Sequence, residues 1–175
     1  MANILPIAHL GAPILRERTT EVENITDVDF LNLIRDMMTT VKDANGLGIA
    51  GPQVYSSLGV FIMASKPSKR YPNAPKTEPL AIINPTILNY SKDKEKDWEG
   101  CLSIPGIRGH VNRSKSIEVT YTTQQGETVT KTLEGFIARI FQHEYDHLNG
   151  TVFLDRLDSN KDIISEKEYQ RIVTT

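Results

Sequence analysis

The stretch "FQHEYDHLNG", Phe141 to Gly150, contains two of the four histidines of this 175-residue chain. His143 and His147 are four residues apart, and Glu144 directly follows the first of them. On an α-helix, positions i and i+4 lie about 40° apart around the axis and about 6 Å apart along it, so both imidazoles face one side. The spacing therefore predicts a pair of metal ligands, with Glu144 placed to approach a water molecule rather than the metal.

The residues around this motif predict that it lies on a helix packed in the core. Apolar side chains recur there at three- and four-residue spacing, at Phe136, Ile137, Ile140, Phe141, Tyr145 and Leu148. The pair Asn149-Gly150 is a helix stop. The alternative is a surface helix whose polar residues are solvated. We favour the metal site, because buried His and Glu side chains without partners are costly.

Patterns elsewhere in the chain predict a mixture of helices and strands. The expected elements are a helix over Thr26–Ala44 capped by Thr26 or Asp27, strands at Val60–Ala64 and Leu80–Ile83, a hairpin of Ile117–Tyr121 with Thr128–Leu133, and a last helix over Ser165–Ile172. The strands are joined mainly by hairpin-like connections. The expected fold class is therefore α+β, with mostly antiparallel sheets around the central helix that carries "HEYDH".

Length and composition predict one domain spanning residues 1–175 and exclude several classes of protein. The net charge is −2 and the most basic segment, "KPSKR" (Lys66–Arg70), is short, so we expect no binding of nucleic acid. The sequence contains no stretch of about 18 apolar residues, so we expect no transmembrane helix. The N-terminus shows no targeting pattern. The lone cysteine forms no intrachain disulfide, which suits the reducing cytoplasm.

That cysteine, Cys101, lies in "EGCLSIPG" (Glu99–Gly106) and is the candidate for a third metal ligand. One thiolate with two imidazoles leaves a tetrahedral position open, which is typical of catalytic rather than structural sites. Gly100 lets the backbone approach closely. The alternative is that Cys101 is a small buried apolar side chain.

A third stretch, "GLGIAGPQ" (Gly46–Gln53), is rich in glycine but is not a phosphate-binding loop. It lacks the Lys-Ser/Thr ending of a P-loop, and it does not match the dinucleotide fingerprint. One interpretation is a simple turn after the preceding helix. Its glycines also allow a substrate backbone to lie against it, and Gln53 offers an amide N–H to a carbonyl oxygen.

In this order and at this spacing, "GLGIAGPQ", "EGCLS" and "QHEYDHLNG" resemble the three signature motifs of the peptide deformylase family, and the match spans most of the chain. One departure is visible. The family's first motif usually has two alanines before Pro-Gln, whereas Gly51 follows Ala50 here. Because a small residue is kept, we expect changed flexibility of this loop rather than lost activity.

The resemblance implies a metal-dependent hydrolase that removes the N-formyl group from the initiator methionine of new polypeptides and releases formate. Cys101, His143 and His147 are then the ligands of one divalent ion. The resemblance favours Fe(II) as the native ion, with Zn(II), Ni(II) or Co(II) able to substitute. Glu144 is implied to be the general base. The side-chain amide of Gln53 and the backbone N–H of Leu102 are implied to stabilise the carbonyl oxygen.

The expected partners are N-formylmethionyl peptides, as nascent chains at the ribosome, bound by a cytoplasmic monomer. The resemblance places Leu47, Ile140 and Phe136 near the methionine side chain, although all three also suit an ordinary core. We expect the peptide to pair as an added strand, with Gly48 on one side and the segment after Ile104 on the other. Gly100 and Arg108 are further candidate contacts, and Glu99 is expected to pair with Arg113 and brace the cysteine loop.

Two other classes of function remain open at the level of sequence. Thermolysin-like and metzincin-like peptidases also carry H-E-x-x-H, but their third ligand is a glutamate or a histidine, and no histidine follows His147. The second open class is a metal-binding interaction module or an inactive member of the family. Such a module needs none of Gln53, Leu102 or Glu144, so their presence favours an enzyme.

Overall fold

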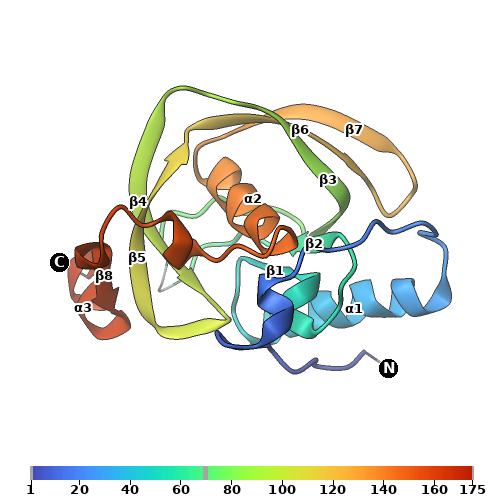
Figure 1. Cartoon of the computed structure of the whole chain (residues 1–175), viewed down its shortest axis with the longest axis horizontal. Helices are drawn as coiled ribbons and strands as arrows, with labels where there is room; N and C mark the ends of the chain where they lie inside the picture. Colours follow the sequence, from blue (N-terminus) through green and yellow to red (C-terminus); the bar gives the residue numbers. More distant parts are fainter. Residues whose placement is uncertain (1, 69–70, 175) are drawn as a thin grey trace.

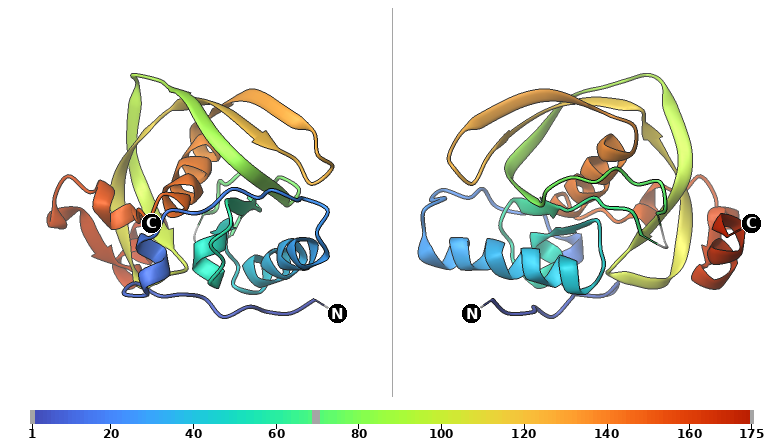
Figure 2. Two further views of the ribbon diagram at one scale, coloured as in Figure 1. Left: turned by 45° about the vertical axis from the view of Figure 1, so that its right-hand side comes forward. Right: turned by 180° about the vertical axis from the view of Figure 1, so that it is seen from behind.

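Helix α2 (Gly135–Leu148) lies at the centre of the molecule, and strands curve around it on two sides (Figure 1). The computed structural model describes residues 2–68 and 71–174. Helix α1 (Val28–Asp43) lies apart from α2. The short α3 (Glu166–Val173) lies at the edge of the molecule opposite α1 (Figure 2). The predicted α+β class, with antiparallel sheets around the helix that carries "HEYDH", is confirmed.

The larger sheet has five antiparallel strands in the order β1-β2-β3-β6-β7. They are β1 (Gly48–Ala50), β2 (Val60–Met63), β3 (Leu80–Tyr90), β6 (Ser116–Thr122) and β7 (Thr128–Glu134). In β2, Ile62 packs with the core beside α1, whereas Phe61 packs with the core beside α2. Both faces of β2 are therefore buried, which explains why its sequence is a continuous apolar run.

The smaller sheet has the order β4-β5-β8 and supplies the cysteine. Its strands are β4 (Lys94–Cys101), β5 (Ile104–Ser114) and β8 (Ile163–Ser165). The pairing of β4 with β5 is irregular between Glu99 and Cys101, where a bulge re-aims the end of the strand. Neither of these two long strands follows from the sequence pattern, because β4 is polar and β5 contains Pro105 and two glycines.

The cap residues predicted from the sequence lie at the ends of helices α1 and α3 in the structure. The side chain of Asp27 accepts hydrogen bonds from the N–H groups of Asp29 and Phe30, so α1 begins one residue later than its cap. Ser165 caps α3 by accepting from the N–H of Glu168. The strand predicted at Leu80–Ile83 runs on to Tyr90, through an irregularity at Asn84, whose φ is 49°.

Short 3-10 turns complete the chain, and one of them belongs to the site. They are η1 (Pro13–Arg16), η2 (Gly51–Val54), η3 (Phe153–Arg156) and η4 (Asn160–Asp162). Among the described residues, no helix has the length and apolar character needed to cross a membrane. Part of the predicted basic loop, residues 69 and 70, lies outside the described residues.

Candidate metal centre

The cysteine from β4 and the two histidines from α2 meet in the interior of the protein. The ligand atoms of Cys101, His143 and His147 all lie within 4.8 Å of one another. The Cys101 Sγ is 3.3 Å from Nε2 of His147, which is 1% exposed. Cys101 precedes the two histidines by 42 and 46 residues, yet the three side chains form one compact group of soft and borderline donors, as divalent transition metals prefer.

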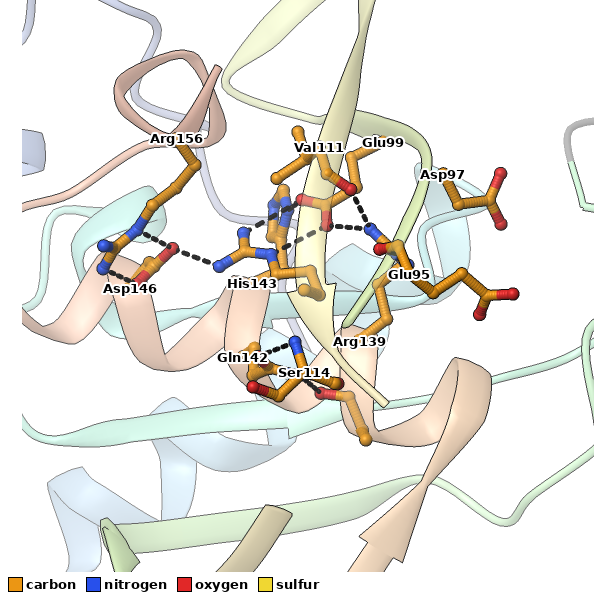
Figure 3. A network of polar contacts seen from close by, with 12 residues as sticks. Glu95, Asp97, Glu99, Val111, Ser114, Arg139, Gln142, His143, Asp146 and Arg156 are labelled. Atoms are coloured by element: carbon orange, nitrogen blue, oxygen red, sulfur yellow. Dashed lines mark hydrogen bonds and ion pairs between the residues drawn. The ribbon is translucent and has the colours of Figure 1, made fainter. Parts of the chain in front are cut away.

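His143 is held in place by a buried carboxylate. Its Nδ1 lies 2.9 Å from Oε2 of Glu99, which leaves Nε2 as the nitrogen that is available to a metal (Figure 3). Glu99 also accepts two hydrogen bonds from Arg113, at 2.9 and 3.0 Å, which confirms the predicted pair. Such a carboxylate fixes the orientation of a ligating imidazole and strengthens it as a donor.

The charges behind His143 are balanced in pairs. Arg139 donates from Nη1 to Glu99 and to the carbonyl of Val111, both at 2.9 Å. Arg113 also donates to Asp146 at 2.6 Å, and Asp146 accepts further hydrogen bonds from Arg156 (Figure 3). Burial alone would raise the pKa of Glu99, but Arg113 and His143 hold that pKa well below its usual range. The carboxylate therefore stays ionised.

Glu144 lies on the same helix with its carboxylate in the pocket. Its Oε2 is buried and has no hydrogen-bond partner among the described residues. Burial raises the pKa of Glu144 to about 7. A Cβ at Gly48 would lie 2.5 Å from Oε1 of Glu144, so only glycine at that position of β1 leaves room for the carboxylate. Glu144 is thus placed for proton transfer, with an ionisation close to neutral pH.

The surroundings of the three ligand residues fit a bound cation. Burial and the nearby His143 lower the pKa of His147 well below its usual range, which keeps it neutral, as a ligand must be. Burial opposes a charge on His143, yet the Cys101 sulfur and Glu99 raise the pKa of His143 well above its usual range. Positive charge is therefore favoured at this point, and three protein ligands leave one tetrahedral position open.

Gln53 connects the glycine-rich loop to the cysteine. In η2, its Oε1 accepts from the N–H of Ala50 at 2.8 Å. Its Nε2 donates to Oγ of Ser103 at 3.1 Å and lies 3.4 Å from Cys101 Sγ. The side chain is 1% exposed, so its amide N–H is fixed beside the ligand cluster.

One pocket contains the predicted catalytic and substrate-binding residues together. Those lining it are Leu47, Gly48, Gln53, Gly100, Cys101, Leu102, Arg108, Phe136, Ile140, His143 and Glu144, whereas His147 is not among the residues that line it. Leu102 also packs toward the glycine-rich loop, since a Cβ at Gly46 would lie 2.9 Å from its Cδ1. Arg108 lines the pocket, but its guanidinium already bonds to Tyr71 and Glu166.

The expectation that a peptide pairs with the segment after Ile104 stays a prediction. Strand β5 pairs with β8 over Ile107–Gly109, and with β4 at Ile104 and from Gly109 onward. The outer strand of the smaller sheet next to the pocket is β4, and that of the larger sheet is β1. Gly48 lies on β1 and Gly100 lies on β4.

Gly51, the departure in the first motif, has a structural cause. A Cβ at this position would lie 2.7 Å from the carbonyl oxygen of Leu58 and 3.2 Å from that of Ser56. Both neighbours are backbone atoms, which cannot rotate away. The loop after η2 therefore requires glycine here, where Gly51 is buried. The expected change in the flexibility of this loop stays a prediction.

Sequence reasoning missed several residues of the pocket wall. Tyr71, Trp98, Arg139 and Asn45 also line it. Arg139 was detectable, because an arginine in the middle of the apolar helix run "FIARIF" requires buried partners. Tyr71 gave no such signal, since it lies in a proline-rich segment with no regular pattern.

Comparison with known proteins agrees with this geometry. Residues 4–162 match the family model described as polypeptide deformylase. Peptide deformylase 2 of Nostoc sp. is 53% identical over 172 residues, which are 98% of this chain and 96% of that protein. Peptide deformylase 2 of Shewanella oneidensis is 47% identical over 152 residues, or 87% of this chain and 83% of that protein.

Solved structures show the same fold. A class I type b peptide deformylase from Acinetobacter baumannii, crystallised with Met-Ala-Ser bound, matches with a TM-score of 0.85 and 44% identity, covering 90% of this chain and 100% of that one. A peptide deformylase from Thermotoga maritima matches with a TM-score of 0.80 and 38% identity, covering 90% and 99%. With the site and these matches in agreement, this chain belongs to the peptide deformylase family of enzymes.

Proposed function

We propose that this protein removes the N-formyl group from the initiator methionine of newly made polypeptides, and that it requires a divalent metal ion held by Cys101, His143 and His147. The observation that carries the proposal is the buried, unpartnered carboxylate of Glu144 beside these three ligands. A structural metal site needs no such group, whereas hydrolysis needs a proton acceptor.

When bound, a divalent ion supplies Lewis acidity, which lowers the pKa of a water molecule and polarises a carbonyl group. Glu144 takes a proton from the water molecule as the water oxygen adds to the formyl carbon. Glu144 then gives this proton to the amine nitrogen as the C–N bond breaks. Formate and a free N-terminus are the products. A pKa of about 7 lets the same carboxyl group accept and return the proton.

Negative charge develops on the formyl oxygen during the addition. Nε2 of Gln53 and the backbone N–H of Leu102 are the donors proposed to stabilise it. Gln53 is held by Ala50 and Ser103, so its amide does not have to reorganise when the charge forms. In this proposal, Gly48 on β1 and Gly100 on β4 flank the peptide backbone.

Selectivity for the substrate rests on two properties of the pocket. The space around Glu144 is narrow, since even a Cβ at Gly48 would collide with it, and this favours a one-carbon formyl group over acetyl. Leu47, Phe136 and Ile140 supply apolar surface for the methionine side chain.

The direct experiment measures formate release from a formyl-Met-Ala-Ser peptide, with and without a chelator. We expect release that the chelator abolishes and that added divalent metal restores. Cys101→Ser should weaken metal binding and change which ion is bound. Cleavage of unformylated peptides without formate release would instead identify a peptidase.

The ion, the oligomeric state and the setting in the cell belong to the same proposal. We propose Fe(II) as the native ion, with Zn(II), Ni(II) or Co(II) able to substitute, because thiolate and imidazole ligands suit all four. Metal analysis of anaerobically prepared protein tests this. We further propose a single-domain cytoplasmic monomer acting on nascent chains at the ribosome, which sedimentation of the protein with and without translating ribosomes would test.

A further inference from the structure

Tyr71 reaches into the pocket from the proline-rich segment that joins β2 to β3. Its hydroxyl oxygen accepts a hydrogen bond from the backbone N–H of Gly100 at 3.2 Å and another from Nη1 of Arg108 at 2.6 Å. The segment is thereby tied to the end of β4, directly next to the cysteine. The sequence predicted no role for it.

The ring of Tyr71 continues the apolar wall of the pocket. Its centroid lies 5.4 Å from that of Phe136, with the two planes tilted by 55°. Phe136 belongs to the first turn of α2, one turn before Ile140. Tyr71 therefore extends the surface that Phe136 and Ile140 present to a ligand. Burial raises the pKa of Tyr71 to about 12, so the phenol stays neutral.

Arg108 holds Tyr71 from behind. Its guanidinium carbon lies 4.7 Å from the centre of the Tyr71 ring and 4.2 Å from that of Tyr169, so it is sandwiched between two aromatic faces. Nε and Nη2 donate to Glu166 of α3, at 2.7 and 3.3 Å. Arg108 is 1% exposed, so binding a substrate directly would require it to give up these bonds.

The space for this arrangement exists because residue 100 is glycine. A Cβ at Gly100 would lie 3.0 Å from Nε of Arg108 and 3.1 Å from its Cζ. The same backbone unit thus leaves room for the arginine and donates to the tyrosine. Three segments, the proline-rich loop, β5 and α3, meet at this point, and their contacts fix one ring of the pocket.

We propose that Tyr71 is a specificity-determining residue, whose ring closes the apolar end of the pocket that takes the first side chain of the peptide, and that Arg108 and Glu166 are its positioning residues. This inference rests on the proposed function for the identity of the ligand. In this inference, Arg108 holds Tyr71 in place and does not bind the substrate.

The test compares Tyr71→Ala with the wild-type enzyme on three peptides that begin with formyl-Met, formyl-Ala or formyl-Trp. Loss of an aromatic wall removes contacts that a long apolar side chain uses and a methyl group does not. We expect the ratio of kcat/KM for formyl-Met over formyl-Ala to fall about tenfold. The formyl-Trp peptide should improve relative to formyl-Met, because the pocket is longer. For formyl-Met, KM should rise while kcat stays within about threefold.

Two more conservative variants distinguish the ring of Tyr71 from the groups that hold it in place. Tyr71→Phe keeps the ring but loses both hydrogen bonds of the hydroxyl. Glu166→Gln keeps a polar partner for Arg108 but removes the negative charge of that partner. Each should raise KM about threefold and leave the Met-to-Ala ratio within about twofold, because the ring remains but is held less firmly. If Tyr71→Ala does not fold, an unchanged KM in both variants overturns the proposal.

Tyr90→Ala is the matched control, because this tyrosine is 51% exposed and does not line the pocket. It should change neither KM nor the ratio. A Tyr71→Ala enzyme that melts like wild type and keeps the Met-to-Ala ratio within twofold would show that Tyr71 only supports the fold of its loop.

A binding measurement keeps this inference separate from the reaction. Calorimetry with the unformylated tripeptides Met-Ala-Ser and Ala-Ala-Ser should show that Tyr71→Ala loses the preference for Met-Ala-Ser. If the wild type releases no formate, the proposed function fails, and this preference still decides the role of Tyr71. If formate is released normally and the preference persists in the variant, only the role of Tyr71 is refuted.

Discussion

The two sides of helix α2 are both buried, yet they are held by different forces. Toward the five-stranded sheet, Ala138, Phe141 and Leu148 pack among apolar side chains. Toward β4 and β5, Arg139 donates a hydrogen bond to Glu99, and Asp146 accepts one from Arg113. The first side is stabilised by the removal of apolar surface from water, and the second by mutual compensation of charges.

The two sides of α2 therefore tolerate different kinds of substitution. On the apolar side, a substitution is acceptable when volume and shape are kept. On the charged side, volume is not enough, because removal of one partner leaves another charge buried without compensation. The charged side also orients His143, whereas the apolar side only positions the helix as a whole. Stability and the orientation of His143 are therefore coupled on the charged side.

The largest effect is expected at Glu144, which carries a buried carboxylate but belongs to neither set of contacts. Glu144→Gln keeps the shape and removes the base, so kcat should fall by about 10²–10⁴-fold. Metal content and melting temperature should stay at the wild-type values, since no ion pair is broken. Steady-state kinetics with metal analysis test this. If the kcat of the variant stays within tenfold of the wild-type value, Glu144 is not the base.

Glu99→Gln tests the charged side itself. The change leaves Arg113 and Arg139 without their shared anion and weakens the hold on His143. We expect a loss of about 3–5 kcal/mol in the free energy of unfolding and of about 10–100-fold in metal affinity. Denaturant melts and metal titration measure the two.

The control for this prediction is Glu118→Gln, which changes an exposed glutamate on β6. It should shift stability by no more than about 0.5 kcal/mol. Equal stability of the two variants would mean that the charged side is not held by pairing.

Gly51→Ala tests the role of space where the neighbour is backbone. It installs the alanine that the family's first motif usually carries, but its Cβ would lie 2.7 Å from the Leu58 carbonyl oxygen. We expect a destabilisation of about 1–3 kcal/mol, seen as a lower melting temperature. Gly126→Ala in the exposed hairpin turn is an unsuitable control, because its φ is 84°. Ser57→Ala, which changes an exposed side chain of the same loop and adds no atom, is the better one.

The smallest effect is expected on the apolar side. Leu148 is 4% exposed and packs with the cluster beside the five-stranded sheet. Leu148→Met keeps the volume, so the loss in stability should be under about 1.5 kcal/mol, with metal affinity unchanged. Metal titration of the variant checks the second half. A loss of metal affinity here would break the separation between the two sides of α2.

Much of the site was predictable because its chemistry is local in sequence. His143, Glu144 and His147 share one helix whose period is fixed by backbone geometry, and the structure gives α2 nearly the predicted bounds. Cys101 followed from the number of ligands that a catalytic site requires. The helix caps were also local, since Asp27 and Ser165 bond within their own turns.

Strands β4 and β5 were not predictable from the pattern, although they carry Cys101 and Arg108. The polar strand β4 is mostly exposed and is specified by its pairing with β5, not by alternation of apolar residues. The sequence pattern also did not show that β5 is the inner strand of the smaller sheet, with β4 on one side and β8 on the other.

The sequence predicted the candidate metal ligands, the candidate proton acceptor and the α+β class, because helix period and cap chemistry act over a few residues and a catalytic metal site needs a third ligand. The groups that surround these residues follow instead from tertiary packing. The pairing of Glu99 with Arg139 and the place of Tyr71 on the pocket wall depend on contacts between distant segments. Such contacts follow from how the chain packs, and no local pattern encodes them.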